Sequence, residues 1–369
     1  ERLFISYDAL KEISEKNNIY LLQIGCYPGN FKPKMRREGQ YFIKKIIFKE
    51  KFEIAGKNFG FHFHYTMPRG VLDKEKLELK LLIDSKLKRM LLNAYNLLIA
   101  LDPALCCLMA SSPYYQGKYY GKDSRVFWYR GGKKLKFNKG LYAEMPLIGS
   151  LPPYKQTLAD LKFSIKKRVQ FWKRLMKKNN LMQHMKDYDS ILEIYWGPVR
   201  INKHDTLEQR GMDMNFLDNI MAITVSLNFI LHRVQHGMLE VVPSDIGLEE
   251  PFKIEGNVLH IPPHTHVRNF LQYYSALEGF SNTKVYSYVK RFYFLAKKST
   301  PKEMKILLKP IADMLDKKQS LSDKIIKIAK RNGFRENLPN YFAKELAIKI
   351  AEKGYKAERK TKKLISKFL

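Results

Sequence analysis

Between Phe59 and Tyr65 the chain alternates strictly between aromatic and non-aromatic residues. Successive side chains of a β-strand point to opposite faces, so this pattern predicts a strand with one aromatic face. The opposite face carries Gly60, His62 and His64. A strand is stable only when it pairs within a sheet. We therefore expect this strand to belong to a sheet.

A second segment, Thr206 to Met214, is also predicted to be a strand, and it places a carboxylate and a guanidinium two residues apart. Glu208 and Arg210 then project from the same face. Such a pair can bind a metal ion through the carboxylate and a phosphate oxygen through the guanidinium. A cross-strand ion pair on a solvated face explains the same two residues without any ligand, and pairs of that kind are common.

The two histidines of the first strand also allow two interpretations. His62 and His64 share a face, and Gly60 beside them permits close approach of another group. Imidazoles placed in this way can ligate a metal or contact a phosphate. A single His-x-His pattern is, however, also typical of histidines with a purely structural role.

Helical and strand periodicities occur in separate parts of the chain, which predicts an α+β protein. The expected helices are Leu3–Lys16, Asp73–Met109 with a break near Asp102-Pro103, Thr157–Asn179, Phe216–Val234 and Val267–Leu295. The further expected strands are Ile19–Ile24, Ile191–Ile201, which should form an antiparallel hairpin with the Thr206 strand, and a short hairpin over Phe252–Ile261.

A polar and aromatic region follows Ser111 and continues to Pro153 without clean periodicity. Loops of this length in a compact domain are usually functional. The candidate ligand contacts in it are Ser112, Tyr115, Gln116, Arg125 and Arg130, although the two arginines could simply be solvated. Outside this loop, Arg200 can contact a phosphate or pair with Asp205.

The net charge of +31 favours association with polyanions, but a lysine-rich composition produced by an AT-rich genome gives the same excess. Roughly half of the excess follows Lys284, and Ser299-Thr300-Pro301 marks a boundary. We therefore expect one domain over residues 1–296 and a basic helical region over residues 297–369. A nucleic acid is one partner that this C-terminal region could bind.

Three cysteines without metal-binding spacing predict a reducing, cytoplasmic setting. The apolar run from Met90 to Met109 is interrupted by Asn93, Asn96 and Asp102-Pro103, which argues against a membrane span. The sequence contains no P-loop, and no G-x-G-x-x-G motif follows a strand. Phosphates would have to be held by other means.

Three ordered motifs carry a resemblance to a known family. They are Gly60-Phe-His-Phe-His-Tyr, Ser112-Pro-Tyr-Tyr-Gln-Gly and Thr206-Leu-Glu-Gln-Arg-Gly-Met-Asp. In order and rough spacing they resemble the family-2 glutamate–cysteine ligases and related carboxylate–amine ligases over about Leu3 to Leu295. The sequence departs from the family pattern at Tyr27, where the family has His, and at Tyr274, where an Arg is usual.

The resemblance implies a glutamine-synthetase-like fold, with an antiparallel sheet curved into a funnel and helices outside it. It implies ATP and Mg²⁺ as cofactors, and amino acids as substrates, commonly glutamate through its γ-carboxylate and an amine such as cysteine. It also implies that Glu208 is a metal ligand, that His62 or His64 lies at the metal–phosphate site, and that Arg210, with Arg200 beside it, neutralises phosphate charge.

The family's first strand, with its Glu-x-Glu metal ligands, has no counterpart here, so we expect residues to precede Glu1. Two functions follow as hypotheses. The first is an ATP-dependent carboxylate–amine ligase. The second is a catalytically inactive relative that binds nucleic acid through its basic C-terminal region. The identities of the acid and amine, and self-association into a homo-oligomer, are left open by the sequence.

Overall fold

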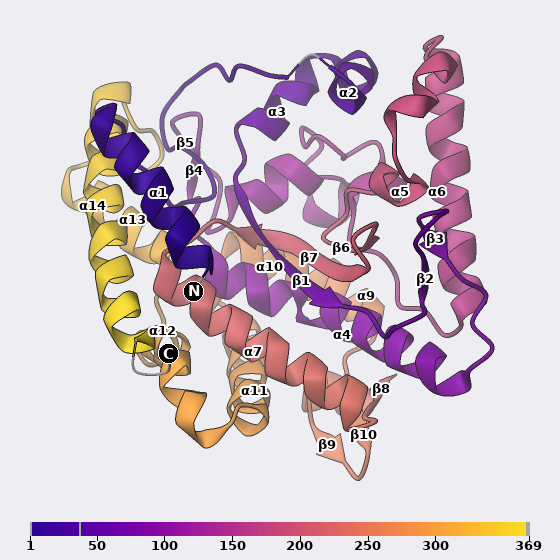
Figure 1. Cartoon of the computed structure of the whole chain (residues 1–369). Helices are drawn as coiled ribbons and strands as arrows, with labels where there is room; N and C mark the ends of the chain where they lie inside the picture. Colours follow the sequence, from indigo (N-terminus) through magenta and orange to yellow (C-terminus); the bar gives the residue numbers. More distant parts are fainter. Residues whose placement is uncertain (1, 37, 367–369) are drawn as a thin grey trace.

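A computed structural model describes residues 2–36 and 38–366 of the chain. The protein is a mixed α+β structure whose central sheet has three strands, in the order β1-β7-β6 (Figure 1). The strands are β1 (Gly60–Thr66), β6 (Val199–Asn202) and β7 (Thr206–Asp213), and both pairings are antiparallel. The strand predicted from alternation, the predicted Thr206 strand and the hairpin before β7 are therefore confirmed. A curved funnel is not seen among the described strands.

The remaining sheets are small. The strand β10 (Val258–Ile261) pairs in parallel with β8 (Glu240–Pro243) and antiparallel with β9 (Ile254–Glu255), which confirms the predicted hairpin at this point. Two further pairs are β2 (Leu72–Asp73) with β3 (Glu78–Leu79), and β4 (Tyr114–Tyr115) with β5 (Lys118–Tyr119).

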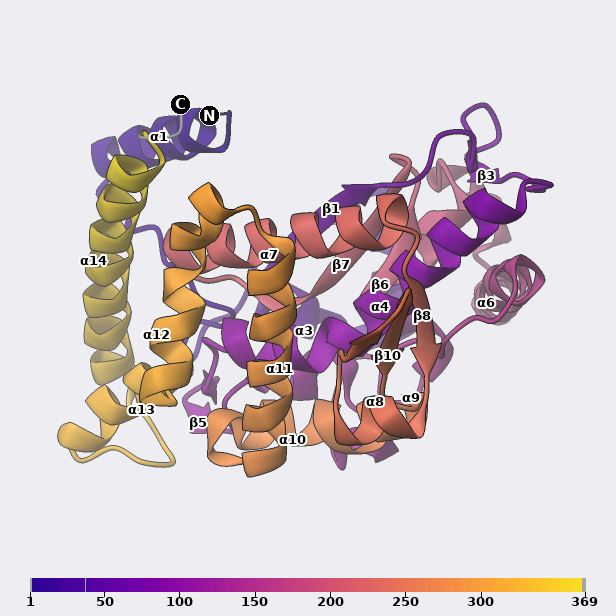
Figure 2. The same ribbon diagram turned by 90° about the horizontal axis from the view of Figure 1, so that it is seen from below.

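A buried helix, α4 (Ser85–Met109), packs beneath the central sheet and is the centre of the core (Figures 1 and 2). It is long and apolar enough to cross a membrane, but 94% of its most apolar window is covered by other parts of the protein. A core helix needs the same composition, so the structure agrees with the prediction that this segment is no membrane span. All three cysteines are free and buried. Cytoplasmic location itself stays a prediction.

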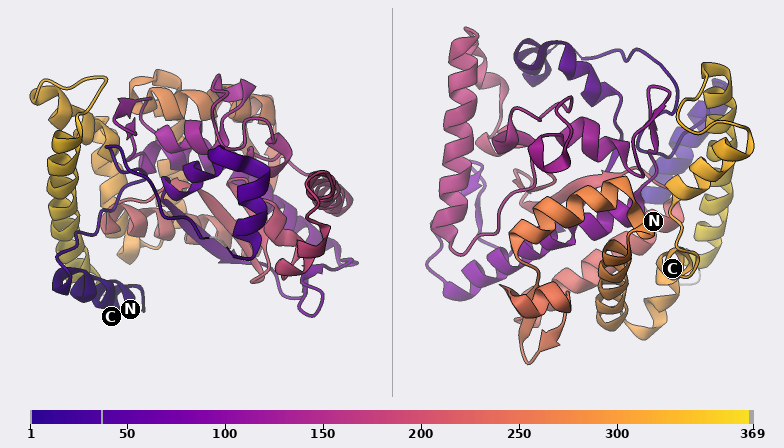
Figure 3. Two further views of the ribbon diagram at one scale, coloured as in Figure 1. Left: turned by 90° about the horizontal axis from the view of Figure 1, so that it is seen from above. Right: turned by 180° about the vertical axis from the view of Figure 1, so that it is seen from behind.

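Other helices surround α4 and the sheet. Those before the C-terminal region are α1 (Arg2–Lys16), α2 (Gln40–Phe48), α3 (Glu53–Gly56), α5 (Pro146–Gly149), α6 (Leu158–Lys178), α7 (Leu217–His236), α8 (Asp245–Glu249), α9 (His264–His266), α10 (Gln272–Leu277) and α11 (Thr283–Ser299). The helix α6 begins with a capping box in which Thr157 and Asp160 each bind the other's backbone N–H. It stands at one edge of the molecule (Figure 3).

The C-terminal region consists of α12 (Lys309–Lys317), α13 (Leu321–Arg331) and α14 (Asn340–Ile365). These helices share a core with the preceding part of the chain. Ile24, Tyr114 and Phe216 pack in one cluster with apolar residues of α13 and α14. The expected domain boundary between residues 296 and 297 falls inside α11, which ends at Ser299, within the segment Ser299-Thr300-Pro301 that the sequence marks as a boundary.

Four expectations about elements are wrong. Ile19–Ile24 is extended but pairs with no described strand, because it lies against α14, where the Tyr355 hydroxyl accepts a hydrogen bond from Leu21 N. Residues 73–84 contain β2 and β3 in place of a helix, and Ile191–Ile194 forms a 3-10 turn. The helix α4 continues through Pro103, since tight packing on all sides supports it and the Tyr288 hydroxyl donates to the Ala100 carbonyl nearby.

Candidate functional site

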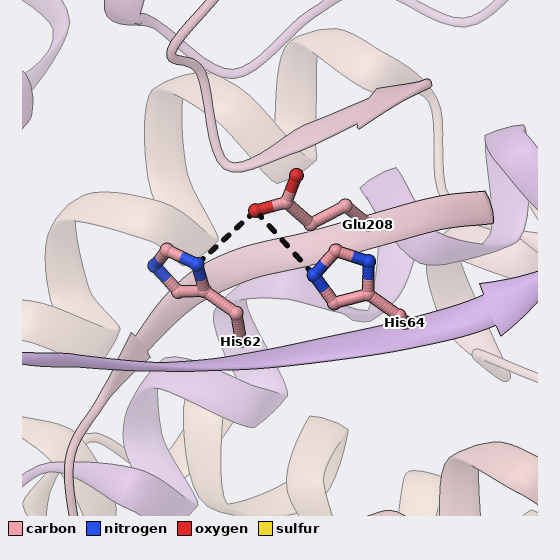
Figure 4. A group of neighbouring side chains, drawn as sticks. All are labelled: His62, His64 and Glu208. Carbon is pink, nitrogen blue, oxygen red and sulfur yellow. Dashed lines mark ion pairs between the residues drawn. The ribbon is translucent and has the colours of Figure 1, made fainter. Parts of the chain in front are cut away.

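The antiparallel pairing of β1 with β7 brings the two histidines to the acidic residue predicted beside them. His64 lies directly opposite Glu208 in the register. Glu208 Oε1 is 3.1 Å from His62 Nδ1 and 3.9 Å from His64 Nε2 (Figure 4). Burial lowers the pKa of both imidazoles, which outweighs the attraction of the nearby carboxylate. Neutral histidines are therefore favoured at physiological pH.

Glu208 also binds one guanidinium group and one amide group from the neighbouring strand β6. Its Oε2 accepts hydrogen bonds from Arg200 Nε at 2.5 Å and from Asn202 Nδ2 at 2.6 Å. Arg210 Nε lies 3.7 Å from Oε1. Burial alone would raise the pKa of Glu208, but the His62 contact, the two arginine charges and Asn202 together hold that pKa far below its usual range. Arg200 thus pairs with Glu208, not with Asp205.

The guanidinium groups of three arginines line a cavity of about 610 Å³ on this face of the sheet. Arg125 enters from the loop after β5 and donates to the backbone carbonyls of Gly211 and Arg210 at 3.0 and 3.1 Å. It approaches next to Gly60, where a Cβ atom would be 2.5 Å from Arg125 Nη2. The other cavity residues are Leu22, Gln40, Tyr41, Ala55, Asn58, Phe59, Gly60, His62, Tyr129, Glu193, Trp196, Arg200, Arg210 and Met214. Glu208 does not form part of this wall.

Two cavity arginines retain donors without acceptors. Arg125 Nε and Arg210 Nε are buried and have no hydrogen-bond partner among the described residues. Unsatisfied buried donors are rare in proteins and cost about 1–3 kcal/mol or more for charged groups. The positive charges of the three arginines would attract an anionic ligand, so the cavity is suited to phosphate or carboxylate binding.

A buried lysine beside these arginines was not predicted from the sequence. Lys44 of α2 is 2% exposed, donates to Gln40 Oε1 at 2.7 Å, and places Nζ 2.8 Å from the ring centre of Trp196. Burial, followed by the charges of Arg210 and Arg200, lowers the pKa of Lys44 well below its ordinary value. Lys44 carries no recognisable motif and lies far along the chain from Trp196, Arg200 and Arg210, so no sequence pattern could have linked it to them.

The structure does not bring the remaining predicted residues to the cavity. Ser112 is buried and donates to Asp213 Oδ2 at 2.7 Å. Tyr115 stacks on Trp128 with ring centres 4.3 Å apart, and Gln116 occupies the tight turn between β4 and β5 with a φ of 50°. Arg130 is neither solvated nor an anion contact, because its guanidinium forms a buried ion pair with Asp102 at 2.6 Å.

A metal ion fits these residues poorly. His62, His64 and Glu208 offer three ligand atoms within 4.8 Å of one another. Mg²⁺ prefers oxygen ligands, and only Glu208 supplies one. Two nitrogens and one oxygen suit a transition metal better, but Arg200 and Arg210 already neutralise the carboxylate and would repel a cation. We derive no chemical step from a metal held by these side chains alone.

Fold and site together define an α+β protein with three arginines around one cavity, next to a histidine–glutamate group. No protein-family model and no curated protein matches the chain in sequence comparison. The interpretation of the site therefore depends on its geometry and chemistry.

Proposed function

We propose that the protein is an ATP-dependent carboxylate–amine ligase, as the resemblance in its three motifs implies. In this reaction a carboxylate oxygen, such as that of the glutamate γ-carboxylate, attacks the γ-phosphorus of ATP and ADP leaves. An amine, such as that of cysteine, then attacks the acyl carbon and phosphate leaves. The proposal includes that the β1-β7-β6 sheet corresponds to part of the curved sheet of glutamine-synthetase-like proteins.

The observation that carries the proposal is the group of three arginines that line one cavity. Transfer of a phosphoryl group depends mainly on cations placed before the reaction begins. Arg125, Arg200 and Arg210 supply such charge from rigid strands and a buried loop. Glu208 positions Arg200 by accepting its hydrogen bond, and Asn202 in turn donates a hydrogen bond to Glu208.

Mg²⁺ is part of the proposed cofactor set only as a complex with ATP. Mg²⁺ usually keeps several waters and binds through one or two carboxylates together with substrate phosphates. Phosphates in the cavity would supply the oxygen ligands that the side chains lack. When bound, the ion would neutralise charge on the transferred phosphoryl group.

The test is ADP release by the purified protein with ATP, Mg²⁺ and pairs of amino acids, beginning with glutamate and cysteine. Arg210→Met should reduce turnover by about 10²–10³-fold, the usual cost of losing one transition-state donor. Arg291→Met, which removes an arginine from an exposed ion pair with Glu250, is the control and should leave turnover unchanged. Tripolyphosphate binding, measured by calorimetry, separates anion binding from catalysis. Binding without ADP release from any pair would contradict the ligase.

The alternative, an inactive relative that binds nucleic acid through the C-terminal region, has less support from the contacts. The cations of α14 alternate with Glu345, Glu352 and Glu358, and Lys362 pairs with Asp8 and Glu358. Deleting this region would also uncover the core that it shares with Ile24 and Phe216. Charge substitutions on the surface are therefore a better test than truncation.

A further inference from the structure

The helix α6 has an unusual distribution of charge. No aspartate or glutamate occurs between Asp160 and Asp187, so most of the helix contains no acidic residue. Six cationic side chains are exposed on it: Lys166, Lys167, Lys173, Arg174, Lys177 and Lys178. At 100° per residue they fall within one arc of about 140°, with Gln170 at its centre. The exposed face of α6, defined by these seven residues, is thus a continuous basic surface.

The cations of this face have no acidic partners. None of the six lies within ion-pair distance of a carboxylate in the described part of the chain. Lys173 and Lys177, and likewise Arg174 and Lys178, are like charges one helical turn apart, which destabilises a helix slightly. A polyanion lying along the face would relieve this repulsion. On α14, by contrast, acidic residues interrupt the cations.

The apolar face of α6 argues against a membrane as the partner. A helix that binds a bilayer inserts its apolar face into the lipid. Here that face is already buried, since Trp172 and Met176 are 1% and 0% exposed within the protein. Phe163 is the one large apolar side chain that α6 exposes strongly. The exposed surface of α6 therefore carries positive charge but has no free apolar face that could insert into a bilayer.

The length of the face fits a nucleic-acid duplex. From Lys166 to Lys178 the helix rises about 18 Å, at 1.5 Å per residue. A duplex carries about one phosphate charge per 1.7 Å of its axis, so about ten phosphates lie within that length. The helix α6 lies at the opposite side of the molecule from α14 in all views (Figures 1 to 3). Its six cationic side chains are exposed to solvent.

We propose that the exposed face of α6 binds the phosphate backbone of a nucleic-acid duplex without sequence preference. This surface is distinct from the arginine cavity and from the C-terminal region, and it requires neither ATP nor a metal. If six cations bind phosphates, a plot of the logarithm of the association constant against the logarithm of the salt concentration should have a slope approaching about −5. Adding amino acids should not affect it.

The experiment measures anisotropy of fluorescent 20-base-pair RNA and DNA duplexes with the full chain between 50 and 200 mM salt. In the test variant all six cations of the face become glutamine. In the matched control six exposed cations of α14 become glutamine: Lys344, Lys349, Lys353, Lys356, Arg359 and Lys360. Both variants lose six positive charges. We expect the α6 variant to bind more than about tenfold more weakly with a shallower salt slope, and the control to change less than about threefold.

Three results would overturn the proposal: equal losses in the two variants, a larger loss in the α14 variant, or no duplex binding by the unchanged protein. Binding to vesicles containing phosphatidylserine that depends on α6, without duplex binding, would point to a membrane partner and also overturn it. If the sixfold variant melts below the unchanged protein, the pair Lys173→Glu and Arg174→Glu replaces it. Charge reversal at two exposed positions leaves the buried face intact.

Discussion

Glu208 illustrates how one residue can satisfy opposite interpretations of the same sequence. It lies in the predicted group with His62 and His64, yet its carboxylate is already bound by Arg200 and Asn202. The ion pair that seemed the ordinary explanation is real, but it is buried and lies behind the cavity wall, not on a solvated face. Its main physical effect is to fix a guanidinium that lines the cavity.

Replacing Glu208 by Gln should destabilise the protein by about 3–5 kcal/mol at pH 7, because Arg200 would stay buried without its counter-charge. The pKa of Glu208 is lowered by folding, so its carboxylate contributes stability above its ordinary pKa and loses it as the pH falls. The difference between variant and unchanged protein should therefore shrink below pH 4. Urea unfolding at pH 3.5 and 7 measures it. Asp189→Asn, in an exposed pair with Lys203, is the control and should leave the midpoint unchanged.

Two buried aspartates should give the opposite dependence of stability on pH. Asp123 and Asp213 are fully buried, and burial, together with each other's charge for Asp123, raises the pKa of both carboxyl groups. Raised carboxyl pKa values make the folded state lose stability as the pH rises through them. Asp123→Asn should therefore gain stability relative to the unchanged protein between pH 4.5 and pH 8. A difference that does not vary with pH would contradict this account.

At the scale of elements, the adjacent strands β1 and β7 each contain a glycine that contacts a different arginine. A methyl group at Gly60 of β1 would meet the cavity arginine Arg125, whereas one at Gly211 of β7 would overlap the buried Asp102–Arg130 pair. Gly60→Ala should weaken tripolyphosphate binding with a modest loss of stability. Gly211→Ala should cost about 1–3 kcal/mol or more of stability by overpacking. Calorimetric titration and thermal melting of both variants separate the effects, and equal changes in affinity would refute the assignment.

Elements could be predicted from the sequence where packing of one face imposes a regular spacing of apolar residues. Alternation identified β1, and the hairpin predicted before β7 is observed, whereas the pairing of β1 with β7 was not predicted. The extended Ile19–Ile24 segment has the composition of a strand, but packing against α14 decided its conformation. Arg130 and Ser112 could not be separated from Arg125 by sequence, since only tertiary packing determines which loop side chains turn inward.

At the scale of the whole molecule, the C-terminal helices behave as part of the structure that holds the site. The helix α14 packs against α7, Lys122 pairs with Asp323 at 2.6 Å, and the Tyr114 hydroxyl donates to the Arg335 carbonyl. These contacts join residues before and after the expected boundary through apolar packing, an ion pair and a hydrogen bond. Such a region should unfold together with the rest of the chain.

A chain ending at Ser299 should therefore lose its single cooperative unfolding transition. Truncation would expose Ile24, Tyr114 and Phe216, which pack against apolar residues of α13 and α14, and apolar burial is the main source of stability. Calorimetry and near-ultraviolet circular dichroism of the truncated and full chains provide the comparison. Loss of the transition and of the aromatic signal would show one cooperative unit. A truncated chain that melts with the same midpoint and enthalpy per residue would instead show that residues 297–369 fold separately, because the remaining core would then be complete without them.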